Sequence, residues 1–359
     1  MAKQHEIVGV DIGYGNIKIA YGNGDVPQVM ILPGGVGLHK LLSQGAQING
    51  QVQPGLYPDG VRVTVKDTDG DGMLVEKEMV AGVDRSRLPG TSIVHHNDFP
   101  STIHYMALYY AVLSIIADSE QESKGVLKID TLVTGLPVNQ ATKENRRALS
   151  RRLAGEHRVN SFLSVFVNKV TVVAQPMGGY WDAAKQFTTE PHQKVFSQGR
   201  VLVLDPGFFS LDWALFDQSY LNNQASGSNN LAMHRILSHV QDEFHNEYGE
   251  ELKIYTIERA IREGHYNVLF GAKDLNIKYL VDKAFNTIAG DVVTELHNAK
   301  QFDREKIDMV VLVGGGAQIY SRVARKAFPH SLIAISPDPV VANARGYWYA
   351  GWMNKQASS

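Results

Sequence analysis

A charged hairpin near the start of the chain is the first candidate for chemistry. The run "VGVDIGYGNIKIAYG" (8–22) places Asp11 at the end of an apolar strand and Lys18 in the strand that follows, with Gly13 and Gly15 between them. A hairpin turn needs one or two glycines. It does not need a carboxylate on a buried strand, where an unpaired charge is costly. The combination predicts a site that requires a carboxylate, an ammonium group and accessible backbone together.

Two later stretches extend this pattern. The run "RVLVLDPGFFSLDWALF" (200–216) again has an apolar strand, an aspartate, a tight glycine turn and a second apolar strand. The run "MVVLVGGGAQIYSRVARKAF" (309–328) is a buried strand, three glycines and then a helix. Glycines let a ligand approach the backbone, and the N-terminus of a helix favours anions. One such loop would be a weak signal, but all three in this order are a much stronger one.

The elements that must position these residues alternate along the chain. Apolar runs such as "VLVLD" and "MVVLVGG" between helical stretches indicate an α/β protein with a central mixed sheet. Residues 25–98 are dense in glycine and proline and are interpreted as a small β-rich insertion, and residues 188–199 as a crossover. Strands are predicted at 6–12, 16–22, 61–66, 73–82, 129–138, 169–176, 200–207, 210–216 and 308–316, and helices at 101–118, 139–155, 231–247, 256–263, 276–300 and 317–328.

Composition sets wider bounds. The 359 residues are 44% hydrophobic and 20% charged, which predicts a soluble globular chain long enough for two domains. A net charge of −2 gives no general reason to expect direct binding to nucleic acid or to a membrane. The absence of cysteine excludes disulfides and thiolate chemistry. No apolar run reaches the roughly 18 residues of a membrane span, so a cytoplasmic location is expected.

The motifs resemble those of the actin-like ATPases, the superfamily of actin, Hsp70 chaperones and sugar kinases, and are most similar to those of the ParM/StbA plasmid-segregation family. The run "DIGYGNIK" (11–18) resembles the first phosphate hairpin of that family, "DPGFFSLD" (205–212) the second, and "VLVGGGAQ" (311–318) the adenosine motif. The runs "VTVVAQPMGGYWDA" (170–183) and "SPDPVVANARGYWYAG" (336–351) resemble the two connecting helices, and "VTGLPVNQATKENRRALSRRL" (133–153) resembles a ParM-type stretch.

The resemblance implies an actin-like ATPase fold, with two duplicated domains around a nucleotide cleft. Domain I would comprise residues 1–190, with the small β-rich subdomain at 25–98, and would be completed by residues 337–359. Domain II would comprise residues 191–336.

The resemblance also implies ATP or GTP, with Mg²⁺, as ligands. Asp11 and Asp205 would hold Mg²⁺ largely through its waters, and Lys18 would neutralise phosphate charge. Gln175 would orient the attacking water, with Asp205 as the other candidate, so Gln175, Asp205 and Asp11 form the expected catalytic set. The expected nucleotide-binding residues are Asp11, Gly13, Tyr14, Gly15, Asn16, Lys18, Asp205, Gly207, Phe208, Phe209, Ser210, Gly314, Gly315 and Gly316.

The second hairpin departs from the family pattern. Phe208 and Phe209 stand where further small residues are usual, and bulky residues cannot cheaply adopt positive φ. The loop is therefore expected to use an allowed conformation or to hold phosphate less closely. Ser210 can still supply a hydroxyl in place of the family's usual threonine. The choice between adenine and guanine stays open.

A separate signal lies in "DTDGDGMLVEKE" (67–78), which satisfies the EF-hand loop pattern with Asp67, Asp69, Asp71, Gly72 and Glu78. Its flanks, "VRVTV" and "EMVAGV", alternate with period two and predict strands rather than the helices of an EF-hand. A polar turn in a β-hairpin is therefore the favoured interpretation. A structural or regulatory calcium site is the alternative.

Three functions fit this reading. The resemblance implies a filament-forming ATPase that polymerises with nucleotide and moves plasmid DNA, with copies of itself and a DNA-binding adaptor protein as partners. A small-metabolite kinase has the same fold but needs a general base near the phosphates, and no extra aspartate motif of that kind is visible in domain I. A non-polymerising actin-like scaffold of a membrane complex is disfavoured by the intact Asp11, Gln175 and Asp205.

Overall fold

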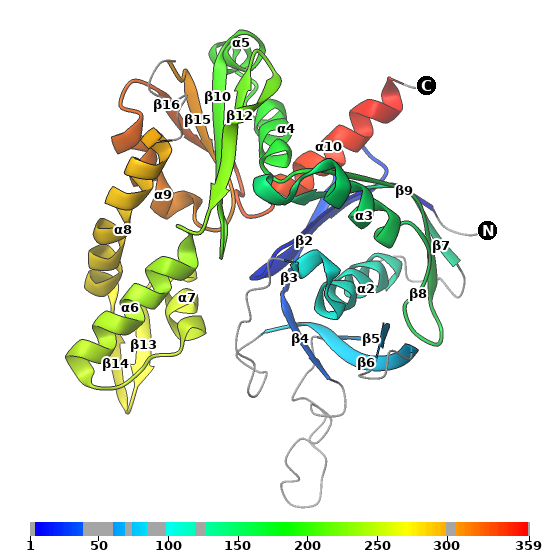
Figure 1. The fold of residues 1–359 in the computed structure, drawn as a ribbon, viewed down its shortest axis with the longest axis horizontal. Coiled ribbons are helices and arrows are strands. Elements are labelled where there is room, and N and C mark those ends of the chain that lie inside the picture. The colour runs from blue at the N-terminus through cyan, green and yellow to red at the C-terminus, as the bar shows by residue number, and fades with distance from the viewer. Residues whose placement is uncertain are drawn as a thin grey trace, which may run out of the picture. The chain divides into compact units, whose positions relative to one another are not determined.

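The computed structural model describes residues 4–38, 60–68, 74–84, 98–118, 126–298 and 306–357. It divides into two units: the first contains Met1–Leu136, Gln140–Asp182 and Val340–Ser359, and the second contains Pro137–Asn139 and Ala183–Pro339. Each unit is built around its own mixed sheet (Figure 1). The α/β class and the mixed sheet predicted from the sequence are therefore confirmed.

The sheet of the first unit has the strand order β3-β2-β1-β7-β9-β8. Strands β1, β7 and β9 run parallel, and β2, β3 and β8 are antiparallel to their neighbours. Parallel neighbours are separated along the chain by helical crossovers, as a parallel pair requires. The strands are β1 (Gln4–Ile12), β2 (Asn16–Tyr21), β3 (Gln28–Pro33), β7 (Val126–Leu136), β8 (Gly155–Arg158) and β9 (Ser164–Ala174).

Helices cover both faces of this sheet. Successive residues of a strand point to opposite faces, and β1 shows the consequence: Val8 belongs to the core cluster that contains α2 (Ile103–Asp118), whereas Ile7 packs with Trp348 of α10 (Ala342–Gln356). Helix α3 (Lys143–Leu153) packs on β9. The apolar runs on both faces of β1 and β7 thus reflect burial from two sides.

A smaller antiparallel sheet with the order β4-β6-β5 belongs to the same unit. Its strands are β4 (Gly35–Leu38), β5 (Val61–Thr68) and β6 (Leu74–Val83), and α2 packs against β5 and β6. The sequence predicts a β-rich insertion over 25–98, but β3 pairs with β2 in the larger sheet. The separate sheet therefore begins only at Gly35.

The second unit has a five-stranded sheet with the order β12-β11-β10-β15-β16. Its central pair, β10 and β15, is parallel, and β11 returns antiparallel beside β10. The β10–β11 hairpin therefore repeats the arrangement of β1–β2, as the recurring sequence pattern predicts. The strands are β10 (Arg200–Pro206), β11 (Leu211–Asp217), β12 (Tyr220–Asn229), β15 (Met309–Leu312) and β16 (Leu332–Ile335).

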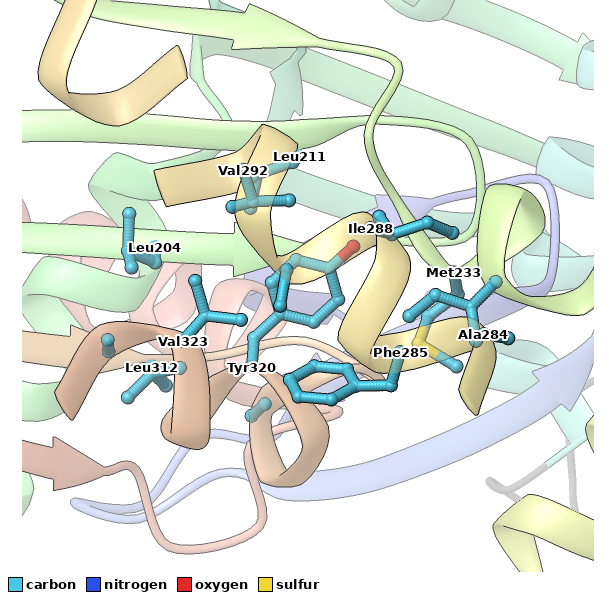
Figure 2. Close-up of a cluster of buried hydrophobic side chains, with 14 of the residues drawn as sticks. Leu204, Leu211, Met233, Ala284, Phe285, Ile288, Val292, Leu312, Tyr320 and Val323 are labelled. Carbon is cyan, nitrogen blue, oxygen red and sulfur yellow. The ribbon is translucent and has the colours of Figure 1, made fainter. Parts of the chain in front are cut away.

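The core of this unit lies between the sheet and its helices. Figure 2 shows part of it, where Leu204 and Leu312 of the sheet lie near Val323 and Tyr320 of α9, with Ile288 of α8 beyond them. A short hairpin of β13 and β14 lies beside α6 and α7 in Figure 1. The remaining elements are α6 (Met233–Tyr248), α7 (Ile254–Arg262), β13 (Asn267–Phe270), β14 (Lys273–Asn276), α8 (Lys278–Asn298) and α9 (Ala317–Ala327).

The predicted helices and strands are present with small shifts at their ends, and two kinds of error stand out. The crossover expected at 188–199 is helix α5 (Glu190–Gln198), which begins after Thr189 with a proline in its first turn, a favoured position for proline. Five strands were not predicted, because the first is polar and the others have only four residues each: β12, β8, β13, β14 and β16.

Helix α4 (Pro176–Gln186) crosses α10 at very close range. A Cβ added to Gly346 would lie 1.8 Å from the carbonyl oxygen of Gly178, so only glycine fits there. Beside the crossing, Arg345 forms two hydrogen bonds with Asp182, Nε to Oδ1 at 2.5 Å and Nη2 to Oδ2 at 2.9 Å. The Asp182 side chain is fully buried. Such a paired geometry is what allows a charge to be buried.

Within the described residues, no helix has both the length and the apolar character needed to cross a membrane.

We expect Arg345→Met to lower the free energy of unfolding by about 3–5 kcal/mol, because it leaves the Asp182 carboxylate buried without its cation. Urea unfolding followed by circular dichroism measures the change. The matched control is Lys355→Met, which removes the half-exposed ion pair between Lys355 and Glu6 and should cost about 0–1 kcal/mol. Equal losses in the two variants would contradict a structural role for the buried pair.

Candidate functional site

The first candidate group surrounds Asp11 at the carboxyl end of β1. Asp11 is 3% exposed, and each of its carboxylate oxygens has a partner. Lys18 Nζ lies 3.0 Å from Oδ2, and Gln175 Nε2 donates to Oδ1 at 2.8 Å. Lys18 reaches Asp11 because the two residues are direct partners in the β1–β2 register. The structure thus brings together three of the residues singled out in the sequence.

Gln175 occupies the junction between β9 and α4. Its backbone N–H donates to the carbonyl of Leu136, at the end of the neighbouring strand β7, at 2.8 Å. Because β1, β7 and β9 are parallel, their carboxyl ends meet at one edge of the sheet, where ligands bind in open α/β sheets. A residue 164 positions from Asp11 along the chain therefore lies beside it.

The turn of the first hairpin is tight. The N–H of Gly13 donates to Asn16 O at 3.1 Å, and the carbonyl of Gly15 accepts from Gly34 N at 2.9 Å. The Tyr14 ring stacks on Phe99, with ring centroids 4.2 Å apart. These contacts fix the turn against two other segments of the unit, so the hairpin presents its backbone in one defined shape.

The second candidate group surrounds Asp205 at the end of β10. Asp205 is 5% exposed and directly faces Asp212 across the β10–β11 hairpin. Gly314 has φ +77°, and a Cβ there would lie 2.1 Å from Asp205 Oδ1. A Cβ on Gly316 would lie 2.9 Å from Pro206, whereas Gly315 faces open space. Close packing against the hairpin thus explains why positions 314 and 316 are glycine, without any ligand. It does not explain why position 315 is glycine.

Phe208 and Phe209 make the second turn without positive φ. Phe208 packs against the core of the unit, and Phe209 stacks on His234 with ring centroids 4.8 Å apart. The Phe208 carbonyl accepts from His234 N at 2.8 Å at the start of α6, and Gly207 N donates to Ser210 O at 2.9 Å. The loop therefore uses an allowed conformation, and it is tied to α6 by an aromatic contact that sequence reasoning missed.

Asp212 ends the second hairpin motif (205–212), but no role in the site was predicted for it from the sequence. It is 1% exposed, and its Oδ2 accepts from the Ser210 hydroxyl at 2.6 Å. Its Oδ1 accepts from the N–H of Val138 at 2.9 Å. The Ser210 hydroxyl expected to meet phosphate thus has an internal acceptor. The hairpin pattern could have identified Asp212, because it lies opposite Asp205 in the register just as Lys18 lies opposite Asp11.

Metal ligation can be judged from the donor set. Among the described residues, no group of three His, Asp or Glu side chains is placed to hold a metal ion. A carboxylate has about four acceptor positions, and the two hydrogen bonds to Asp11 leave room for more. This set fits a cation such as Mg²⁺, which keeps most of its water, better than an ion bound by side chains alone.

The middle of the proposed calcium loop, residues 69–73, lies outside the described residues. Asp67 lies in β5 and Glu78 lies in β6, while Asp69 and Asp71 are not described. The two flanks pair as antiparallel strands, with Thr64 opposite Glu78. The predicted strands are therefore confirmed, and the helical flanks of an EF-hand are not found. Calcium binding stays a prediction.

Two family models match the chain. Residues 9–178 match the model of the N-terminal domain of actin-like proteins. Residues 203–323 match the C-terminal model of the archaeal actin homologue MreB-like proteins. Each match includes one of the two aspartate hairpins. No curated protein matches the chain in sequence.

Solved structures match over nearly the whole chain. The actin-like protein Alp7A is 15% identical, with a TM-score of 0.71 and coverage of 99% of this chain and 98% of that one. A 15-stranded ParM filament from Clostridium botulinum is 19% identical, with a TM-score of 0.68 and coverage of 98% and 100%. The archaeal actin homologue Ta0583 in complex with ADP is 16% identical, with a TM-score of 0.67 and coverage of 97% and 99%. At these identities the likeness shows the fold.

Proposed function

Because the chain belongs to the actin-like proteins, we propose that it is a nucleotide-dependent, filament-forming ATPase or GTPase of the ParM type. Its actin-like fold is the one predicted from the sequence motifs. Under this proposal the protein acts in the cytoplasm, polymerises with copies of itself, and moves plasmid DNA through a DNA-binding adaptor protein. The neighbours that support it include a ParM filament and an ADP complex of an actin homologue.

One observation carries the nucleotide part of the proposal. A buried carboxylate, an ammonium group and a glutamine amide converge at the end of β1, beside a glycine turn. Packing requires no such set there, since apolar residues of similar volume stabilise a sheet at least as well as a buried ion pair. A phosphate with a hydrated cation can use all three groups: the ammonium for the phosphate, the carboxylate for the waters of the cation, and the amide to orient a water.

Each residue then has a role that its geometry allows. Asp11 would contact the waters of Mg²⁺, as the family resemblance also implies for Asp205, and the ion would neutralise phosphate charge when bound. Lys18 places its ammonium at the Asp11 hairpin, where it attracts the phosphates. Gln175 donates its amide N–H to Asp11, which directs its Oε1 as an acceptor for an attacking water. Such positioning supplies most of the catalysis in phosphoryl transfer.

We expect labelled ATP or GTP to bind with roughly micromolar or tighter affinity in the presence of Mg²⁺, within the range that ordinary contacts provide. Fluorescence anisotropy measures the affinity, and parallel titrations decide between the two bases. Lys18→Met should weaken binding by about 10-fold, a loss of about 1.4 kcal/mol. The exposed Lys128 on β7 provides the control variant Lys128→Met. If neither nucleotide binds saturably, the proposed function is wrong.

We expect Asp205→Ala to preserve nucleotide binding and to slow hydrolysis by about 10²-fold or more, as the loss of a positioned electrostatic group does. Gln175→Ala should act in the same way but less severely, by about 10-fold. Phosphate release under saturating nucleotide measures both. The matched control is Asp217→Ala, which removes a carboxylate of the same sheet that pairs with Arg200. A parental rate in Asp205→Ala would remove Asp205 from the mechanism.

Assembly should depend on the γ-phosphate. A ligand shifts an equilibrium only through its different affinity for two states, so a filament that responds to nucleotide must bind triphosphate more tightly than free subunits do. Contacts that do not close into a ring produce open filaments. We therefore expect pelleting with a non-hydrolysable triphosphate and little with diphosphate, above a critical concentration.

The slow variant gives the internal control for this assembly experiment. Polymers of Asp205→Ala should outlast parental polymers after nucleotide is exhausted, since hydrolysis is what weakens them. A chain that stays monomeric with every nucleotide, across salt and crowding conditions, would favour the kinase or scaffold instead.

A further inference from the structure

We propose that Tyr347 is a positioning residue: its hydroxyl fixes the backbone of Gln175 and thereby directs the Gln175 amide at Asp11. The inference rests on the proposed function for its effect on hydrolysis, but its structural part is independent of that function. Tyr347 lies on α10, 172 residues from Gln175 along the chain. Its hydroxyl donates to the backbone carbonyl of Gln175, so its effect on Asp11 would pass through Gln175.

The backbone of Gln175 is held at both of its polar atoms. Its N–H donates to Leu136 O at 2.8 Å. Its carbonyl accepts from the Tyr347 hydroxyl at 3.1 Å and from Gly178 N at 3.1 Å. Three elements thus fix this one residue: β7 through Leu136, α4 through Gly178, and α10 through Tyr347. The side chain of Gln175 is therefore attached to a backbone that has little freedom to rotate.

The strand β7 leaves space for the hydroxyl. A Cβ added to Gly135 would lie 2.0 Å from the Tyr347 hydroxyl oxygen and 3.1 Å from Gln175 Cα. Any residue other than glycine would therefore displace the hydroxyl or Gln175 itself, because contacts under 3.0 Å force a shift. Gly135 is extended backbone, without positive φ. Glycine is thus required here for the close approach and not for the conformation.

Packing fixes the tyrosine ring. Tyr347 is fully buried in a small cluster with Val133 and Val173, against which Met177 and Trp181 also pack. A phenylalanine would keep these ring contacts and lose only the hydroxyl. A buried hydroxyl costs free energy unless it is hydrogen-bonded, so an apolar cluster gains nothing from carrying one. The hydrogen bond to the Gln175 carbonyl compensates the cost of burying the hydroxyl.

The chemical consequence lies in the Gln175 amide. Its Nε2 lies 2.8 Å from Asp11 Oδ1, and this distance depends on where the backbone carries the side chain. A displacement of about 1 Å in a positioning group can cost up to about 10²-fold in rate. The loss of one of two bonds to the carbonyl is a smaller disturbance. We expect Tyr347→Phe to lower kcat by about 3–10-fold, with the nucleotide KM changed by less than about 2-fold.

The structural part is tested without nucleotide. Selective ¹⁵N-glutamine labelling makes the backbone and side-chain amides of glutamine visible by NMR, and Gln175→Ala identifies the signals of Gln175 by their loss. Tyr347→Phe should shift both signals of Gln175. The matched control is Tyr109→Phe, which removes another buried hydroxyl of the same unit, one that donates to Leu153 O at 2.8 Å. That control should lower thermal stability and leave the Gln175 signals unchanged.

The kinetic part uses a double-mutant cycle. If Tyr347 acts only through Gln175, the double variant Tyr347→Phe/Gln175→Ala has the same kcat as Gln175→Ala alone. Effects that multiply would overturn the proposal, because Tyr347 would then act elsewhere. Tyr109→Phe should retain the parental kcat at a temperature where all the variants are folded.

The two proposals fail in different ways. Unshifted Gln175 signals in Tyr347→Phe, or a parental kcat in that variant while Gln175→Ala is slow, overturn the positioning role. A parental chain without hydrolysis refutes the proposed ATPase or GTPase, and the NMR shift then decides by itself whether Tyr347 positions Gln175.

Discussion

A buried carboxylate at the end of an apolar strand is stable only if partners compensate its charge. Asp11 has two such partners, which come from different parts of the chain. Lys18 comes from the next strand of the hairpin, and Gln175 comes from the far end of β9. The first partner needs only the hairpin register. The second needs the parallel order of β1, β7 and β9, and therefore the helices that return the chain to the start of each strand. The position of one side chain thus ties together most of the first unit.

Each of the two hairpins contains a buried aspartate, but the residue opposite that aspartate differs in charge. Asp11 faces a cation across its hairpin, whereas Asp205 faces a second carboxylate, Asp212, and both of these acids are buried. Backbone and hydroxyl donors satisfy Asp212. The two turns therefore stabilise their buried carboxylates in different ways: the first with an ammonium and an amide, the second with hydroxyl and backbone donors to Asp212.

The sequence was most informative where chemistry and local pattern coincide. Asp11 and Lys18 could be paired from their spacing, because hairpin register follows from the turn. Gln175 was placed only through the family resemblance, since no local pattern connects it with Asp11. The stacking of Phe209 on His234 could not be predicted from the sequence, because it depends on how the turn packs against α6. The sequence predicts only a crossover at 188–199 and not helix α5, although a proline in the first turn is favoured at a helix start.

The crossing of α4 and α10 has a mechanical consequence. The two helices meet at Gly178 and Gly346 through their backbones, with no side chain between them. Interlocked side chains can exchange rotamers and let two helices slide, but a contact of bare backbone has no such freedom. Sliding by one residue would bring Tyr347 or Arg345 to the point where only a hydrogen atom fits. A small tilt about the contact costs much less. The geometry of the crossing therefore favours tilting over sliding, as a pivot does.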